Sequence, residues 1–499
     1  MLQVFEEYRL TMDVLLIQPP HKDRTPSIFP IGLGYIAKSL MDIGCKVEIL
    51  DIHTEGINEE KVQKRIANFN FDLIGINAFS TQYKYIKWLT NEIKQHTKVP
   101  IVLGGPLATH NPELVLKNTD VDICVVGEGE ITIKELVTNK DLHNVRGIYF
   151  KDGKEIVKNL PRDNIVNLDT IEFMPYEIFH MDVYFRHIRL WGGNAKRVIN
   201  LITSRGCPYN CNFCSRTLQG VRYRSINNVV SEIKVLKGKY NIEGILFNDE
   251  LVIASKKRAY ELCEEMSKIG VEWGCQGRAN LVDLELLKTM KKAGCVYVGY
   301  GIESGSQKIL DNMNKKVTIK QNKEAIINTL KVGMVPVAQM IFGYPGEDRK
   351  TIQETIDFYR EIHYSPPTPD YKPAELSLIT PLPGSSLYAY CIQSQKILDE
   401  EDYLLRIEKG YDRGCPLLVN FTDFSNDELL QLKDDTEKIL YTNYQKYMRR
   451  HPALLGNSLF KKVINYRRMY GYRKLLMLFM LKFTEILKLQ WIKLSEKFF

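Results

Sequence analysis

Three cysteines lie within eight positions of the segment TSRGCPYNCNFCS, residues 203–215. Cys207, Cys211 and Cys214 follow the spacing Cys-x₃-Cys-x₂-Cys, and no fourth cysteine stands beside them. A tetrahedral zinc site or a conventional iron–sulfur cluster takes four protein ligands. Three thiolates therefore predict either a distant fourth ligand or a metal centre with one free coordination position.

The composition limits the class of protein. The chain has 499 residues, 44% apolar and 26% charged, which is typical of a globular protein with two or three domains. Apart from the three in the loop, its ten cysteines are scattered, which favours a reducing cytosol over a secreted disulfide framework. We find no signal-peptide pattern and no run of ~18–20 apolar residues, so we expect a cytoplasmic protein without a membrane span.

Residues 13–130 predict an open parallel sheet. Short runs rich in Val, Ile and Leu alternate with amphipathic stretches, as in a doubly wound α/β domain with helices on both faces. The runs span residues 13–20, 45–53, 71–80, 99–105 and 121–130. In such sheets ligands bind at the carboxyl ends of the strands. The candidate ligand-binding residues there are Ser80, Thr81, Gly104, Gly105, Glu128 and Gly129.

Residues 198–390 predict a second domain of repeated β-then-α units. Six strand-like runs span residues 198–204, 244–249, 271–277, 296–301, 335–343 and 374–380. Six units indicate a partial (β/α)₆ barrel, in which loops at the strand carboxyl ends carry the chemistry. The cysteine segment follows the first of these strands directly.

Two segments complete the predicted domain order of 1–140, 141–197, 198–390 and 391–499. Residues 141–197 read as a connector, with a hairpin at 147–157 around an Asp–Gly pair and a linker after it. Residues 391–499 are expected to be helical. Residues 441–499 hold 13 Lys and Arg against 2 Asp and Glu, although the net charge of the whole chain is only +8. This basic amphipathic tail fits either a helix on an anionic membrane surface or a helix docked on the barrel.

The cysteine spacing after the first barrel strand resembles the signature of the radical S-adenosylmethionine (SAM) superfamily. The later motifs resemble that family in order: FNDELV (247–252), QGRANLVD (276–283), GIESGS (301–306), FGYPGED (342–348) and TPLPGSSLY (380–388). The resemblance implies a [4Fe–4S] cluster on the three cysteines, with one iron open to SAM. It also implies cleavage of SAM to methionine and a 5′-deoxyadenosyl radical, with an electron from an external donor such as flavodoxin or ferredoxin.

The same resemblance gives candidate SAM-binding residues. The backbone of Phe213 would meet the adenine, and Gly343 and Pro345 would shape the adenine wall. The candidates for holding the amino, carboxylate and ribose groups are Asp249, Glu250, Arg278, Glu303 and Ser304. Each has a structural alternative, such as a helix cap for the acidic pair or a surface ion pair for the arginine. The family's commoner Asp–Asp pair is Asp–Glu in this chain, which leaves the roles of those two residues open.

The N-terminal domain resembles the cobalamin-binding domain that precedes the barrel in a large subclass of radical SAM enzymes. The resemblance rests on QPP, FPIGLGYIAKSL, GCKVEILD, INAFST, VLGGP and VVGEGE in that order. Asp51, His53 and Gly56 match a cobalt-ligating pattern of methyltransferases, but they follow the second strand instead of the first. We therefore expect cobalamin bound without a histidine ligand, and His21 is the better-placed alternative.

These resemblances imply a cobalamin-dependent radical SAM enzyme, most often one that methylates an unactivated carbon. In that chemistry the adenosyl radical removes a hydrogen, methylcobalamin donates a methyl radical and a second SAM restores the methyl group. An oxidative cyclisation or rearrangement with the same cofactors is the alternative. RNA methylthiotransferases share the motif but have three N-terminal cysteines, where this chain has only Cys45 and Cys124. An iron–sulfur electron carrier or cobalamin sensor is the non-enzyme alternative.

The expected partners follow from the same features. We expect a small-molecule or lipid substrate, and the basic tail would allow a peripheral contact with the inner face of the membrane. The basic residues belong to no recognisable RNA-binding module, which argues against nucleic acid.

Overall fold

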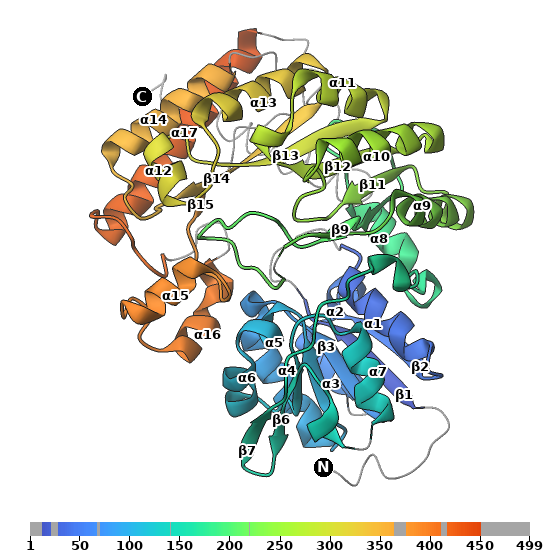
Figure 1. Cartoon of the computed structure of the whole chain (residues 1–499). Helices are drawn as coiled ribbons and strands as arrows, with labels where there is room; N and C mark the ends of the chain where they lie inside the picture. Colours follow the sequence, from blue (N-terminus) through green and yellow to red (C-terminus); the bar gives the residue numbers. More distant parts are fainter. Residues whose placement is uncertain are drawn as a thin grey trace, which may run out of the picture.

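The computed structural model describes residues 12–450 except 21–27, 67–69, 140, 219, 364–375 and 411–416. Figure 1 shows two α/β bodies, with the N-terminal strands in blue and the later strands in green and yellow. His21 and the tail from residue 451 lie outside the described residues. Within the described ranges, no helix is long and apolar enough to cross a membrane.

The first body is a seven-stranded sheet ordered β2-β1-β3-β4-β5-β6-β7. Its parallel strands are β1 (Asp13–Gln18), β2 (Lys46–Asp51), β3 (Leu73–Asn77), β4 (Ile101–Gly104) and β5 (Ile123–Val125). The helices around it are α1 (Ile31–Met41), α2 (Ile52–Glu55), α3 (Glu59–Ile66), α4 (Tyr83–His96), α5 (Pro106–His110), α6 (Pro112–Asn118) and α7 (Glu130–Thr138). Helices cover both faces, so the central strands are apolar along most of their length. The predicted doubly wound sheet is confirmed.

The hairpin predicted in the connector belongs to this first sheet. β6 (Ile148–Asp152) and β7 (Glu155–Lys158) form the hairpin, and β6 pairs antiparallel with β5. The Asp–Gly turn explains the hairpin itself, because Gly153 adopts a positive φ of 59°. The hairpin joins the first sheet because the edge of β5 is free to pair with β6.

The second body is a six-stranded sheet of parallel strands in chain order. The strands are β8 (Val198–Leu201), β11 (Gly244–Phe247), β12 (Glu272–Gly277), β13 (Cys295–Glu303), β14 (Val335–Phe342) and β15 (Leu376–Leu378). The helices between them are α9 (Ile226–Tyr240), α10 (Lys256–Ile269), α11 (Leu284–Lys292), α12 (Gln307–Asn312), α13 (Ile319–Lys331) and α14 (Arg349–His363). Trp273, Tyr300 and Phe342 pack in the core between the sheet and these helices. The predicted partial barrel is confirmed.

The segments outside the two sheets tie the bodies together. The connector includes α8 (Met181–His187), whose Tyr184 hydroxyl donates to Asp51 over 2.6 Å. The Asn200 side chain of β8 bonds both the N–H and the carbonyl of Phe29, at 3.0 and 2.9 Å. Of the C-terminal helices α15 (Ser386–Gln393), α16 (Glu400–Gly410) and α17 (Asn426–Arg450), the first two pack on the first body. Glu401 of α16 accepts a hydrogen bond from Tyr83 over 2.9 Å.

Candidate functional site

The three cysteines lie on a loop between two short strands. β9 (Ser204–Arg205) and β10 (Arg222–Tyr223) pair antiparallel and close the base of this loop. The Cys214 N–H donates to the Cys211 carbonyl over 3.3 Å, and the two thiols are in hydrogen-bond contact. Among the described residues, no set of three His, Cys, Asp or Glu side chains is arranged for a single metal ion. The cluster ligands therefore stay a prediction from the spacing, supported by the thiols' shared surroundings.

Positive groups surround the thiols. The hydrogen bond from Cys214 is the main cause that lowers the pKa of Cys211 to about 6, and nearby Lys315 and Arg278 act in the same direction. The same contact raises the pKa of Cys214. A thiol must lose its proton to bind iron, so cations at this position favour the ligating form.

Among the predicted SAM-binding residues, Arg278 is the one best placed to bind a ligand. Its side chain is buried, its guanidinium stacks 3.7 Å from the centre of the Tyr209 ring, and Nη1 lies 3.8 Å from Cys211 Sγ. Its Nε and Nη2 are buried without a hydrogen-bond partner among the described residues. Such unpaired donors carry a desolvation cost that a bound carboxylate would offset. This donor set fits the carboxylate of SAM, so SAM binding at Arg278 stays our proposal.

We expect Arg278→Gln to weaken SAM binding by roughly 10- to 100-fold, the cost of a lost charge-assisted hydrogen bond. Equilibrium dialysis of SAM against the iron-loaded full chain measures it. Arg349→Gln is the matched control, because its side chain is 67% exposed. Unchanged SAM affinity in the Arg278 variant, at normal iron content, would contradict this role.

Glu303 ends β13 in a strained backbone position. Its φ is +64°, which only glycine adopts freely, and its buried carboxylate pairs with Lys315 over 2.6 Å. A Cβ at Gly301 would approach Glu303 Oε1 to 2.3 Å, so the glycine makes room for this ion pair. The pair lies near Cys214, which places Glu303 at the predicted site.

The acidic pair after β11 separates into two environments. Asp249 is buried, and its carboxylate accepts hydrogen bonds from Thr203 N–H at 2.9 Å and Ser204 Oγ at 2.5 Å. Asp249 therefore holds the start of the cysteine loop and acts as a positioning residue. Glu250 accepts from the Gly206 N–H, and partial burial raises its pKa. Of the two acids, Glu250 is the one left to reach a ligand.

Four further barrel candidates are Phe213, Ser304, Gly343 and Pro345, and each makes local contacts. Phe213 packs edge-on to Tyr344, with ring centres 6.4 Å apart. Ser304 is buried and accepts from the Ser306 N–H over 3.1 Å, so its hydroxyl serves the local turn. Gly343 has a φ of +82°, and the Pro345 carbonyl accepts from Asn312 over 3.1 Å.

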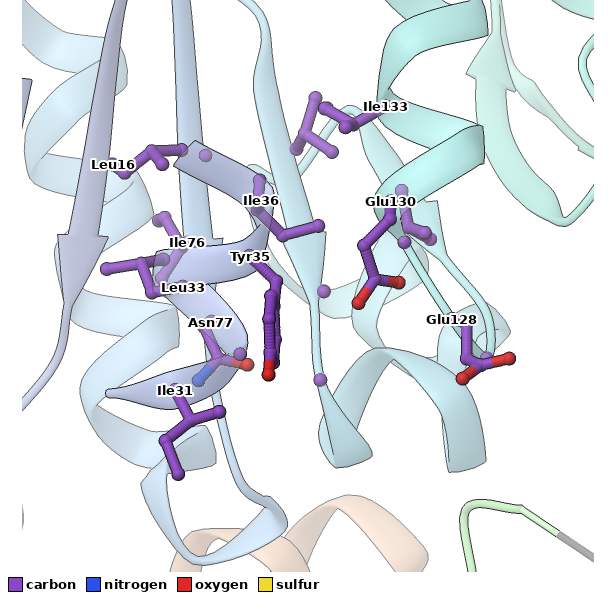
Figure 2. Close-up of a pocket in the computed structure, with 18 of the residues that line it drawn as sticks. Leu16, Ile31, Leu33, Tyr35, Ile36, Ile76, Asn77, Glu128, Glu130 and Ile133 are labelled. Atoms are coloured by element: carbon purple, nitrogen blue, oxygen red, sulfur yellow. The ribbon is translucent and has the colours of Figure 1, made fainter. Parts of the chain in front are cut away.

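A cavity of about 250 Å³ lies over the carboxyl ends of β1, β3, β4 and β5. Figure 2 shows Tyr35 and Ile36 of α1 on one side of it and Glu130 and Ile133 of α7 on the other. Four predicted residues line it: Gly104, Gly105, Glu128 and Gly129. Ser80 and Thr81 form a 3₁₀ turn, η2 (Ser80–Gln82), and are not in the lining.

The cavity fits part of cobalamin. A Cβ at Gly32 or Gly104 would meet no atom within 4 Å, so both glycines open onto free space. The walls are mostly apolar, which suits a flat organic group. In the described part of the chain no histidine lines the cavity, and His53 follows the edge strand β2; cobalamin without a histidine ligand stays a prediction.

Sequence reasoning missed the barrel residues that reach this cavity. The lining includes Ile202, Arg205 and Leu218 from the cysteine loop and its base. Arg205 pairs with Glu128 at 2.6 Å and with Glu130 at 2.5 Å, and Arg222 pairs with Glu128 at 2.8 Å. Burial would raise the pKa of Glu128, but hydrogen bonds from both arginines outweigh it and leave the pKa below its ordinary value. Glu128 thus stays ionised between the two bodies.

We expect Glu128→Ala to destabilise the cofactor-free chain by about 3 kcal/mol, because it removes the carboxylate that pairs with two arginines whose side chains are only 12% and 16% exposed. The free energy of unfolding in urea measures it. Glu264→Ala removes an exposed helix pair with Lys268 and should change little. Equal effects of the two variants would show that the buried pairs do not stabilise the contact between the bodies.

Comparisons with known proteins match both bodies. A "Radical SAM superfamily" model matches residues 201–359, and a "B12 binding domain" model matches residues 24–137. An uncharacterised methyltransferase of Pyrococcus horikoshii is 32% identical over 404 residues, 78% of this chain and 84% of the relative. The anaerobic magnesium-protoporphyrin IX monomethyl ester cyclase of Rubrivivax gelatinosus is 31% identical over 414 residues, 79% of this chain and 72% of the relative.

A solved structure shares the fold. The radical SAM methyltransferase TsrM from Kitasatospora setae, solved with cobalamin and a [4Fe–4S] cluster bound, superposes with a TM-score of 0.63 at 19% identity. The match covers 78% of this chain and 76% of TsrM.

Proposed function

Because the chain belongs to the family of radical SAM enzymes with a B12-binding domain, we propose that it methylates a carbon atom of a small molecule. Its cofactors are SAM, a [4Fe–4S] cluster and cobalamin. One observation carries the proposal: Arg205 lines the cobalamin cavity and stands two positions before Cys207 of the cluster loop. A methyl carrier beside a radical source is the arrangement that carbon methylation needs.

The chain's own residues bind and orient these groups. When bound, the cofactors supply an adenosyl radical and a transferable methyl group. Cys207, Cys211 and Cys214 would hold the cluster, and Arg278 with Glu250 would hold the polar end of SAM.

The test uses the full chain, loaded anaerobically with iron, sulfide and cobalamin, and SAM carrying a ¹³C-labelled methyl group. A small-molecule extract serves as the source of substrate, and mass spectrometry follows the label. We expect a product that has gained one labelled CH₂ unit, together with S-adenosylhomocysteine. Formation of 5′-deoxyadenosine without transfer of label would reject methylation.

Formation of 5′-deoxyadenosine without a labelled product would favour the alternative, which is oxidative cyclisation or rearrangement with the same cofactors. Methylation is the main proposal because the Pyrococcus methyltransferase has the higher identity of the two relatives and is covered over more of its length. Flavodoxin or ferredoxin as electron donor, and a membrane contact through the tail, stay predictions from the sequence.

A further inference from the structure

The two faces of the barrel sheet differ along β13. Val298, Tyr300 and Ile302 pack into the core beneath the helices. Side chains alternate along a strand, so Gly299 and Gly301 face the opposite side, the inner face of the barrel. A Cβ at Gly299 would approach the Gln276 amide to 2.4 Å, so this glycine leaves room for the glutamine to lie over the strand.

Carboxamide side chains flank these two glycines. Gln276 of β12 is in register with Gly299, and Gln339 of β14 is in register with Gly301. Gln339 is exposed; it pairs with β13 and stands one residue before the pairing of β14 with β15 begins. Asn248 follows β11 directly and is exposed as well. Within the described ranges, none of the three carboxamides has a hydrogen-bond partner.

Arg278, two residues after Gln276, is proposed above to bind the SAM carboxylate, and the other charges beside Gly301 are paired. Lys315 and Glu303 neutralise each other over 2.6 Å above Gly301, and both side chains are only 9% exposed. A carboxylate or ammonium group on this surface would lose hydration without gaining an opposite charge. An acyl chain would instead leave carboxamide donors and acceptors unsatisfied. A neutral group that both donates and accepts hydrogen bonds meets neither penalty.

We propose that this inner face binds the substrate through a flat, uncharged group that presents a donor and an acceptor side by side, such as a carboxamide or a lactam. Gln276, which lies over Gly299, and Gln339 bond the edge of the group from the strands on either side of β13. The proposal rests on the proposed function and names the substrate class for that site. It replaces a lipid chain, which the sequence left open, with a polar neutral group.

The test measures binding of benzamide and its charged isostere benzoate to the full chain loaded with cluster, SAM and cobalamin. Ligand-observed NMR or calorimetry gives the dissociation constants. We expect benzamide to bind at least about tenfold more tightly than benzoate. Gln276→Leu and Gln339→Leu should each weaken benzamide binding by about tenfold. Gln353→Leu, on the exposed face of α14, is the matched control and should change nothing.

A charge-introducing variant keeps the test decisive if the leucine variants fold poorly. Gln339→Glu preserves shape and should prefer the cation benzamidine over benzamide by about tenfold. Equal binding of benzamide and benzoate, no binding of benzamide, or no change of preference in Gln339→Glu would overturn the proposal. The readout is separate from catalysis: a wild-type protein that binds benzamide but transfers no methyl label would reject the proposed function and leave the binding surface standing.

Discussion

Cys211→Ala is expected to lower SAM cleavage by at least about 1000-fold, because the cluster would lose the most deeply buried of its three thiolates. Cys211 is in contact with Cys214 and lies next to the Arg278 guanidinium. In the anaerobic variant, the iron content, the visible absorption and the amount of 5′-deoxyadenosine formed should all decrease.

The control is Cys45→Ala, a buried cysteine of the first body that is remote in sequence from the loop. It should keep iron content and SAM cleavage near the wild-type level. A Cys211→Ala protein that retained a SAM-responsive cluster would refute the ligand set. Zinc in place of iron in the wild-type protein would do the same.

Gly104→Leu is expected to weaken cobalamin binding by at least about 100-fold while the chain still folds. Gly104 ends β4, and a Cβ there meets no atom within 4 Å, so a leucine side chain would occupy the cavity without displacing its neighbours. Cobalamin absorbance after equilibrium dialysis measures the loss. SAM cleavage without methyl transfer should persist, because the cysteine loop is untouched.

Two variants separate this effect from a general loss of stability. Gly104→Ala adds one methyl group and should reduce cobalamin binding far less than leucine does. Gly238→Leu adds the same side chain at a second glycine whose Cβ would meet nothing within 4 Å, on α9. If Gly104→Leu bound cobalamin as tightly as Gly238→Leu, the cavity would not be the cobalamin site.

Arg205 and Leu218, at the base of the cysteine loop and within it, line the cavity proposed for cobalamin. Glu128 lies on the cavity lining and pairs with Arg205, and Arg205 precedes the cysteine loop by one glycine. A displacement of the first body would therefore pull on the base of the loop. We infer that the ion pairs fix the distance between the methyl carrier and the radical source.

The sequence by itself determined the chemistry and the two sheets. The thiol spacing predicted three cluster ligands, and the alternation of apolar runs with amphipathic stretches set the strands and helices, because both signals are local. Only the tertiary structure decided that Asp249 anchors the cysteine loop while Glu250 stays available to a ligand. It also decided that the 147–157 hairpin extends the first sheet and that Arg205 reaches Glu128. These outcomes depend on which surfaces meet after long stretches of chain have folded back, and the periodicity of neighbouring residues carries no record of such distant pairings.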